Sequence, residues 1–331
     1  MSKNEVEKQL AYEKFRSALP EILSSAGYSE LYGYDLAQLN QATDGDNVII
    51  LETLLRKFLQ ANNYEITEST NQLVKSLKWR KKFNPLSAAF LEKHSPELEK
   101  LGIVTSAVPK NSTDNLVTTW NLYGAVENRE AVFRNLDAFL RWRVGLMEQG
   151  VSLLNFSKAG ESSMTQVHDY FDVSFFRLDS STKAATKATI ELLQDHYPES
   201  LQAKYFVNVP TIMSWVFAFV KPFLSKETTS KFHVLASGKD LAEDLGDWVP
   251  KTYGGVGGDS LNTIRVKQFK PRDQSLVKSL TASTTESTEP TTTTSANPAP
   301  DAGTAVADNS KAPTGVSAVP SDGPSASTAA P

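Results

Sequence analysis

The first hundred residues carry a repeating pattern of apolar positions that is typical of helices. Apolar side chains recur three, four, seven and eight residues apart, which places them on one face of a helix. The positions that follow this pattern are Leu51, Leu54, Leu55, Phe58, Leu59, Leu73, Leu77 and Phe83. Asn84-Pro85 then ends the run, because proline does not continue a helix. The pattern predicts a helical N-terminal domain over residues 1–101.

A different pattern begins at Val117, where short runs rich in β-branched and aromatic residues alternate with amphipathic stretches. The runs that predict strands are 117–126, 164–179, 205–210 and 231–237. The stretches that predict helices lie near 128–149, 180–197, 212–224 and 239–245. Such alternation favours a mostly parallel sheet with flanking helices. The sequence therefore predicts an α/β fold, with an α/β domain over residues 102–270.

The end of the chain has a composition that cannot build a core. Residues 281–331 consist mostly of Thr, Ser, Ala, Pro and Gly, and they contain no aromatic residue, Leu, Ile or Met. Such a segment buries too little apolar surface to offset its conformational entropy, so residues 271–331 are predicted to be a disordered tail. Residues 281–331 also carry one Lys against five acidic residues, which accounts for the whole net charge of −4. The neutral remainder argues against a nucleic-acid partner.

The absence of cysteine excludes disulfides, thiolate metal sites and a cysteine nucleophile. The N-terminus is charged from its start and lacks the apolar stretch of a signal peptide. The longest apolar stretch, 212–220, is about half of the ~20 residues that span a bilayer. The expected location is therefore the cytoplasm.

Arg143 interrupts the apolar stripe of the helix predicted near 128–149. The stripe consists of Val132, Phe133, Leu136, Phe139, Leu140 and Met147. A guanidinium that faces a core must find an anion or reach water, because an unpaired buried charge is costly. Two interpretations stay open: a structural ion pair or snorkelling side chain, and an anionic ligand in a pocket.

His168 and Tyr170 share one face of the strand predicted over 164–179, because residues two apart in a strand point the same way, and Asp169 points away. One interpretation is a core histidine beside a core tyrosine. The other is a pair of metal ligands, since imidazole nitrogen and phenolate oxygen both ligate haem iron. A Ser-His-Asp hydrolase is disfavoured because the chain has no Gly-x-Ser-x-Gly turn.

Two lysines, Lys204 and Lys231, lie at the starts of predicted strands. Each is either a solvated surface lysine or a ligand contact at an end of the sheet. The apolar stretch 212–220 is either a buried helix or a lid over an apolar ligand.

Several stretches resemble the CRAL-TRIO family, and more closely its fungal phosphatidylinositol transfer proteins. The matching stretches are TLLRKFLQA, KWRKKFNP, HYPESLQAKYFVNVP, FVKPFLSKETTSKFHVL and YGG. They follow the family's order and cover about residues 50–258. The resemblance implies a helical N-terminal bundle, an α/β domain with a deep apolar cavity, and a gating helix that begins near Ile212. It also implies a lipid headgroup site at Glu199, Thr228 and Lys231, while Asn62 replaces a basic residue of the family.

The stretches WNLYG, RWRVGLMEQG and TQVHDY are similar to one branch of this family, the non-classical transfer proteins that bind haem. The resemblance implies ferric haem b as a cofactor, with His168 and Tyr170 at the iron. It implies supporting contacts from Tyr123, Arg143 and Lys204. Arg143 and Lys204 are suited to the two propionates, because both side chains form charge-assisted hydrogen bonds with carboxylates.

The expected function is therefore the transfer of phosphatidylinositol, without covalent chemistry, by a protein that also binds haem. The resemblance links such a protein to phosphoinositide homeostasis and an oxidant stress response, with transient, peripheral contact with endoplasmic reticulum or microsomal membranes. The alternative is a haem-dependent redox enzyme or sensor without significant lipid transfer. A pure interaction scaffold would leave Arg143 unexplained.

Overall fold

The computed structural model describes residues 3–126, 129–173, 179–209 and 230–277. Residues 1–288 form one compact unit, and the fold described below belongs to it. The predicted gating helix, Thr228 and residues 278–331 of the predicted tail lie outside the described residues.

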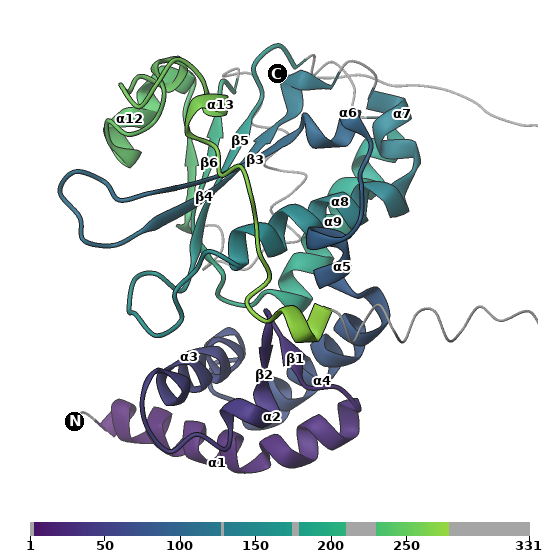
Figure 1. The fold of residues 1–331 in the computed structure, drawn as a ribbon, viewed down its shortest axis with the longest axis vertical. Coiled ribbons are helices and arrows are strands. Elements are labelled where there is room, and N and C mark those ends of the chain that lie inside the picture. The colour runs from purple at the N-terminus through teal and green to yellow at the C-terminus, as the bar shows by residue number, and fades with distance from the viewer. Residues whose placement is uncertain (1–2, 127–128, 174–178, 210–229, 278–331) are drawn as a thin grey trace, which may run out of the picture. The chain divides into compact units, whose positions relative to one another are not determined.

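The N-terminal part is a bundle of helices, as the apolar spacing predicts (Figure 1). Its elements are α1 (Lys3–Ala26), β1 (Glu30–Leu31), β2 (Tyr34–Asp35), α2 (Leu36–Leu39), α3 (Asp46–Ala61) and α4 (Ile66–Phe83). The apolar stripes of α1, α3 and α4 meet in a core in which Phe15, Leu54 and Leu77 are fully buried. Asn84 ends α4 in the left-handed conformation, and its side chain accepts a hydrogen bond from the Ser87 amide at the start of the next helix, α5 (Pro85–Phe90).

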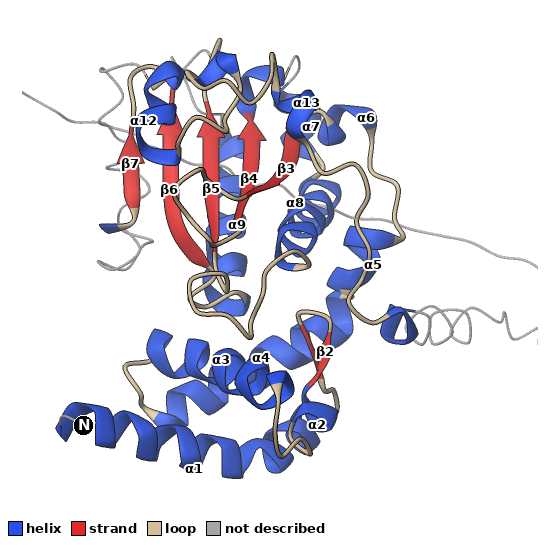
Figure 2. Ribbon diagram, turned by 60° about the vertical axis from the view of Figure 1, so that its left-hand side comes forward, coloured by secondary structure: helices blue, strands red, loops and turns tan. Residues whose placement is uncertain are grey.

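A five-stranded sheet forms the second part of the unit, and its strands follow one another in chain order (Figure 2). The strands are β3 (Gly102–Ala107), β4 (Leu116–Leu122), β5 (Met164–Asp169), β6 (Leu201–Val207) and β7 (Phe232–Val234). β3 pairs antiparallel with β4, and the other neighbours pair in parallel. The predicted mostly parallel sheet is confirmed, whereas β3 was not predicted.

Helices cover both faces of this sheet (Figure 2). On one face, α8 (Leu136–Val151) and α9 (Ser180–His196) pack in the larger core, which includes Met164 of β5. On the other face, α12 (Leu241–Leu245) packs on Trp120 and Val167. The short helices are α6 (Pro96–Glu99), η1 (Tyr123–Ala125), α7 (Arg129–Arg134), η4 (Gly238–Asp240), η5 (Lys251–Tyr253) and α13 (Leu261–Ile264).

The helix predicted near 128–149 is two helices in the structure, α7 and α8. The break falls at Asn135, whose side chain accepts a hydrogen bond from the amide of Ala138 and so begins α8. Asparagine competes for backbone donors in this way and often starts a helix. The apolar stripe survives the break, with Phe139 and Met147 buried, and Arg143 is buried within it.

The chain after α13 runs back to the helical bundle. Val266 donates its amide to the carbonyl of Val104, and further along Arg272 donates to the Tyr34 hydroxyl at 2.9 Å and to the Val151 carbonyl at 2.7 Å. Val277 is 6% exposed. Residues 271–277, which the predicted domain boundary places in the tail, are thus held against the folded unit, because Arg272 reaches carbonyl groups at the end of α8.

Candidate ligand-binding cavity

A cavity of about 810 Å³ lies between the helical bundle and the α8 and α9 face of the sheet. At its buried end the wall is formed by Arg143 of α8, Gln166 and His168 of β5, and Lys204 of β6. At its exposed end the wall is formed by amide side chains of α3, α4 and the turn between them, together with Glu199 and Lys231. The amides are those of Gln60, Asn62, Asn63, Asn71 and Gln72. The structure therefore brings three of the predicted haem contacts, Arg143, His168 and Lys204, to one cavity with two of the predicted headgroup contacts, Glu199 and Lys231.

Arg143 is a buried cation. It is 1% exposed, and none of its three guanidinium nitrogens has a hydrogen-bond partner among the described residues. Burial lowers its pKa, and the nearby Tyr123 and Tyr197 hydroxyls only partly oppose this effect. An uncompensated buried charge is one of the costliest groups in a folded protein. The guanidinium is therefore positioned to bind an anion that enters the cavity.

Two further bases lie at the same end of the cavity. The Lys204 ammonium lies 5.5 and 5.6 Å from the ring centroids of Phe206 and Phe232. Burial, and then the charge of Arg143, lower the pKa of Lys204 to about 7. Burial, Lys204 and Arg143 together hold the pKa of His168 well below its usual value, so its imidazole is neutral at pH 7. Its Nε2 atom has no hydrogen-bond partner among the described residues.

The described acidic residues of the cavity wall all lie at its exposed end. They are Glu68, Asp195 and Glu199. Lys75 pairs with Asp195 at 2.7 Å, and Lys231 pairs with Glu199 at 3.1 Å. None of these acids is within an ion-pair distance of Arg143 or Lys204. The buried end of the cavity is therefore electropositive and lacks a counter-ion from the described part of the chain.

His168 and Tyr170 lie on the same side of the sheet, as the two-residue period predicts. The Tyr123 ring lies 5.6 Å from His168 and 5.4 Å from Tyr170, between centroids. Phe206 contacts both rings from β6. Burial, and then Tyr123, raise the pKa of Tyr170, so its phenol is protonated in the ligand-free protein. The cavity wall reaches His168, whereas Tyr123 and Tyr170 lie beside His168 and outside that wall.

Asp169 points to the opposite face and fixes the end of β5. Its carboxylate accepts hydrogen bonds from the Tyr253 hydroxyl at 2.6 Å, the Asn208 amide at 2.7 Å and the backbone amide of Phe171 at 2.8 Å. These bonds hold the backbone on which His168 and Tyr170 are mounted. Tyr253 and Asn208 lie within stretches that carry the family resemblance, YGG and HYPESLQAKYFVNVP, but nothing in the pattern assigns either residue to Asp169.

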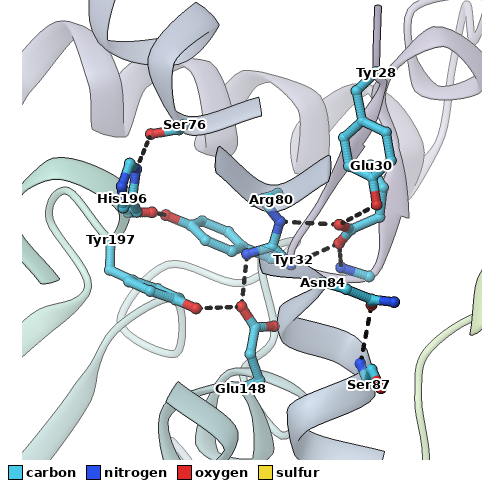
Figure 3. Close-up of polar contacts among 11 residues, drawn as sticks. Tyr28, Glu30, Tyr32, Ser76, Arg80, Asn84, Ser87, Glu148, His196 and Tyr197 are labelled. Carbon is cyan, nitrogen blue, oxygen red and sulfur yellow. Dashed lines mark hydrogen bonds and ion pairs between the residues drawn. The ribbon is translucent and has the colours of Figure 1, made fainter. Parts of the chain in front are cut away.

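Behind the cavity, a buried network of charges joins the bundle to the sheet domain (Figure 3). Arg80 of α4 pairs with Glu30 at 2.7 Å and with Glu148 of α8 at 2.6 Å. The Tyr197 hydroxyl donates to the same Glu148 at 2.5 Å, and Tyr197 lines the cavity. Burial alone would lower the pKa of Arg80, but Glu148 and Glu30 raise it well above its usual value. The sequence gives little signal for this network, since its four members come from four distant segments.

Asn62, which the resemblance places at a basic position of the family, connects α3 to α4 at the exposed end of the cavity. Its amide nitrogen donates to the Phe58 carbonyl at 2.8 Å and to the Gln72 side chain at 2.6 Å. Gln72 in turn donates to the carbonyls of Gln194 and Asp195 at the end of α9. This end of the cavity therefore carries an uncharged amide where the resemblance implies a basic residue.

The described residues contain no group of three or more His, Cys, Asp or Glu side chains that could hold a metal ion. The metal prediction therefore rests on the His168 and Tyr170 pair alone. Within the described part of the chain, no helix combines the length and apolar character that crossing a membrane requires.

Comparison with known proteins identifies the family. The CRAL/TRIO domain model matches residues 117–255. Phosphatidylinositol transfer protein SFH5 of Kluyveromyces lactis is 42% identical over 265 residues, which are 80% of this chain and 87% of the relative. This chain belongs to the CRAL-TRIO family of fungal phosphatidylinositol transfer proteins.

Two further comparisons agree with this membership of the family. The SFH5 protein of Saccharomyces cerevisiae is 41% identical over 261 residues, which are 76% of this chain and 87% of the relative. The crystal structure of Sfh5 superposes with a TM-score of 0.76 at 37% identity, and the match covers 86% of this chain and 100% of that chain. The resemblance to the CRAL-TRIO family and the predicted α/β architecture are confirmed.

Proposed function

We propose that this protein carries phosphatidylinositol between membranes and binds ferric haem b as a second ligand of the same cavity. The observation that carries the proposal is Arg143, a buried cation without a counter-ion in the described part of the chain, at the end of a cavity of about 810 Å³. The buried guanidinium suits a propionate of haem, because the carboxylate neutralises the charge while the apolar macrocycle avoids water.

The exposed end of the cavity suits the inositol phosphate headgroup. Lys231 offers a cation to the phosphodiester, and the Glu199 carboxylate can accept hydrogen bonds from ring hydroxyls. The surrounding amides, among them Gln60 and Asn63, both donate and accept, as hydroxyl groups require. The relatives named above are called phosphatidylinositol transfer proteins. Carrying a lipid needs no bond to be made or broken, so the proposed activity is not an enzymatic one.

The buried end has the residue types that haem requires. His168 has a ring nitrogen without a partner among the described residues, and Arg143 and Lys204 provide two cations for the two propionates. Tyr170 would hold the iron as a phenolate, with His168 on or beside the metal and Tyr123 packed against both. Because burial raises the pKa of Tyr170, its phenol would have to release its proton to solvent or to a neighbouring base for the oxygen to bind a cation. Bound ferric iron would supply redox chemistry, which an anionic oxygen ligand biases toward the oxidised state.

The membrane contact in this proposal is transient and peripheral. A carrier of this kind needs only to dock while its cavity opens, and the endoplasmic reticulum is the membrane we propose. A role in phosphoinositide homeostasis and in the response to oxidants follows from the two ligands.

Purification of the full chain from its natural expression host, followed by an absorbance spectrum and mass spectrometry of extracted ligands, tests both ligands at once. We expect a Soret band and a phosphatidylinositol mass, and we expect transfer of labelled phosphatidylinositol between vesicles. A spectrum without haem bands, after haem has been supplied, would remove haem from the proposal. Haem without bound lipid or transfer would favour a haem-dependent redox enzyme or sensor instead.

A further inference from the structure

Lys57 is a buried cation of the bundle that no motif of the sequence explains. It lies in α3 between the buried residues Leu55 and Phe58 and is 4% exposed. Its ammonium group lies 6.0 Å from the centroid of the Phe156 ring. A lysine in such a place costs stability relative to an apolar side chain of similar length. Its retention among apolar neighbours calls for a role other than stabilisation.

The described contact of Lys57 crosses from the bundle to the edge of the cavity. Its Nζ atom donates a hydrogen bond to the backbone carbonyl of Glu199 at 2.6 Å. Glu199 has a φ of 49°, in the left-handed region that non-glycine residues avoid because Cβ crowds the backbone. A conformation of this kind persists only when its surroundings hold it. The bond from Lys57 holds the peptide unit that follows Glu199.

The side chain of Glu199 depends on that backbone conformation. It lies at the exposed end of the cavity, where its carboxylate pairs with Lys231 at 3.1 Å. Lys57 itself does not line the cavity wall, so it acts on a ligand only through Glu199. Two lysines from separate segments, Lys57 and Lys231, thus meet at Glu199, a residue of the proposed headgroup site.

We propose that Lys57 is the positioning residue of the headgroup site: it holds Glu199 in its left-handed conformation so that the carboxylate meets Lys231 and the inositol ring. This inference rests on the proposed function for the identity of the headgroup, but not for the ordering of Glu199.

The charge of Lys57 depends on pH within an accessible range. Burial lowers its pKa to about 8, with Lys231 acting in the same direction and Glu199 opposing them. The charged groups that face it are Glu199, from the loop after α9, and Lys231, from the segment before β7, and the Phe156 ring faces it from the loop after α8. The ammonium is therefore present at pH 7 and is lost as the pH rises through about 8, which weakens its hold on the Glu199 carbonyl.

Two variants of Lys57 separate positioning from stability. Lys57→Met keeps the length of the side chain and removes the donor, and Lys57→Arg keeps a cation that does not titrate. Lys81→Met is the matched control, because Lys81 also donates to a backbone carbonyl, that of Gly27, at 3.0 Å and away from the cavity. Amide hydrogen exchange of residues 197–201 is measured on the ligand-free proteins. The dissociation constant for dioctanoyl-phosphatidylinositol is measured at pH 7 to 9.5.

We expect Lys57→Met to exchange at least tenfold faster at residues 197–201 and to bind the short-chain lipid at least tenfold more weakly, with an unchanged or higher thermal midpoint. Lys57→Arg should stay within about threefold of wild type. Affinity should fall severalfold between pH 7 and 9.5 in wild type and stay nearly constant in Lys57→Arg. Lys81→Met should match wild type in amide exchange, in lipid affinity and in thermal midpoint.

Unchanged exchange at residues 197–201 in Lys57→Met would overturn the positioning role whatever the lipid does. Faster exchange in Lys57→Met, with no binding of the lipid by wild type, would overturn the proposed headgroup and leave the positioning of Glu199 supported. Binding that is lost in Lys231→Ala but kept in Lys57→Met would overturn the contribution of Lys57 to affinity.

Discussion

At the scale of single residues, the cavity is distinguished by cations that lack nearby acids. Arg80 is as deeply buried as Arg143, yet it has two carboxylates within 2.7 Å, whereas Arg143 has none among the described residues. The desolvation of a buried charge is offset only by an opposite charge or by hydrogen bonds. The carboxylates beside Arg80 provide this compensation within the fold, whereas Arg143 requires it from a ligand. Replacement of Arg143 should therefore raise the free energy of unfolding of the ligand-free protein, whereas replacement of Arg80 should lower it.

Arg143→Met should stabilise the ligand-free protein and lower its affinity for haem. Removal of an unpaired buried charge should raise the free energy of unfolding by about 1 to 3 kcal/mol, since apolar replacements of buried charges are often stabilising. Urea unfolding of the ligand-free protein measures this change, and haem titration measures the loss of affinity. Arg141→Met is the control, because Arg141 lies on the same helix but pairs with Glu92. A destabilised Arg143→Met would mean that the guanidinium has a counter-ion in the ligand-free state.

Tyr170→Phe tests the iron ligand, because it deletes one oxygen and keeps the ring that packs against Tyr123 and Phe206. We expect a folded protein, with stability within about 1.5 kcal/mol of wild type, that retains little haem or shows shifted Soret and charge-transfer bands. His168→Ala should change the spectrum less if His168 only orients the phenolate, and comparably if it binds iron. A Tyr170→Phe spectrum identical to that of reconstituted wild type would return His168 and Tyr170 to the interpretation of a packed core.

The sequence predicts part of this site from local rules. The inward position of Arg143 follows from the helical period, and the shared face of His168 and Tyr170 follows from the strand period. Neither period indicates Lys57 as a contact of Glu199, because that contact joins residues 142 positions apart. The left-handed conformation of Glu199 is also absent from the pattern, since glutamate gives no signal for a positive φ.

At the scale of elements, the bundle and the sheet domain are joined through the end of α9. The Tyr32 hydroxyl donates to the His196 carbonyl at 2.7 Å, and the ring of Trp79 stacks on His196 at 4.1 Å between centroids. Arg80 adds the charged tie from α4 to α8. These contacts and that of Lys57 with Glu199 all join the bundle to the sheet domain.

Arg80→Met should loosen this junction. It leaves Glu30 and Glu148 buried without their cation, which should cost about 3 to 5 kcal/mol of unfolding free energy. Denaturant unfolding measures the loss. As a control, Lys187→Met removes one side of the exposed pair with Glu191, which should change stability by less than about 1 kcal/mol. Equal losses of unfolding free energy in Arg80→Met and Lys187→Met would show that Arg80 does not hold the bundle to the sheet domain.

Elements with a strong period were predictable, and those set by distant partners were not. The apolar stripe of α3 and the parallel strands β4 to β7 are visible in the sequence. β3 was not predicted, because the six residues Gly102–Ala107 carry only a short signal and become a strand by pairing with β4. The break between α7 and α8 depends on a single side chain, Asn135, which the apolar stripe runs across.

At the scale of the whole molecule, the fold extends beyond residue 271, where the tail was predicted to begin. Arg272 is stacked on Tyr34 and Phe156, and it donates to carbonyls of Val151 and Leu154. The predicted boundary at residue 271 would cut off this side chain. Residues 281–331, by contrast, contain no aromatic residue, Leu, Ile or Met for a core to bury.

Two truncated chains, ending after residue 280 and after residue 270, should therefore differ clearly in their unfolding temperature. A chain that ends after residue 280 keeps Arg272 and should unfold within about 4 °C of the full chain, because the removed residues lack core-forming side chains. A chain that ends after residue 270 loses the bonds of Arg272 and the buried Val277, so it should unfold at a clearly lower temperature. Each charge-assisted hydrogen bond of this kind contributes about 1.5 to 3 kcal/mol, and 1 kcal/mol corresponds to about 2 to 4 °C for a domain of 150 to 250 residues.

Arg272→Met in the full chain tests whether this one side chain accounts for the difference in unfolding temperature between the two truncated chains. It should reproduce most of the loss seen after truncation at residue 270, because the carbonyls of Val151 and Leu154 then lack their donor at the end of α8. Lys270→Met, two residues earlier and exposed, is the matched control. If both truncations unfold together with the full chain, the segment 271–277 belongs to the tail after all. If only the truncation at residue 270 is destabilised while Arg272→Met is not, burial of Val277 holds the segment in place of the guanidinium.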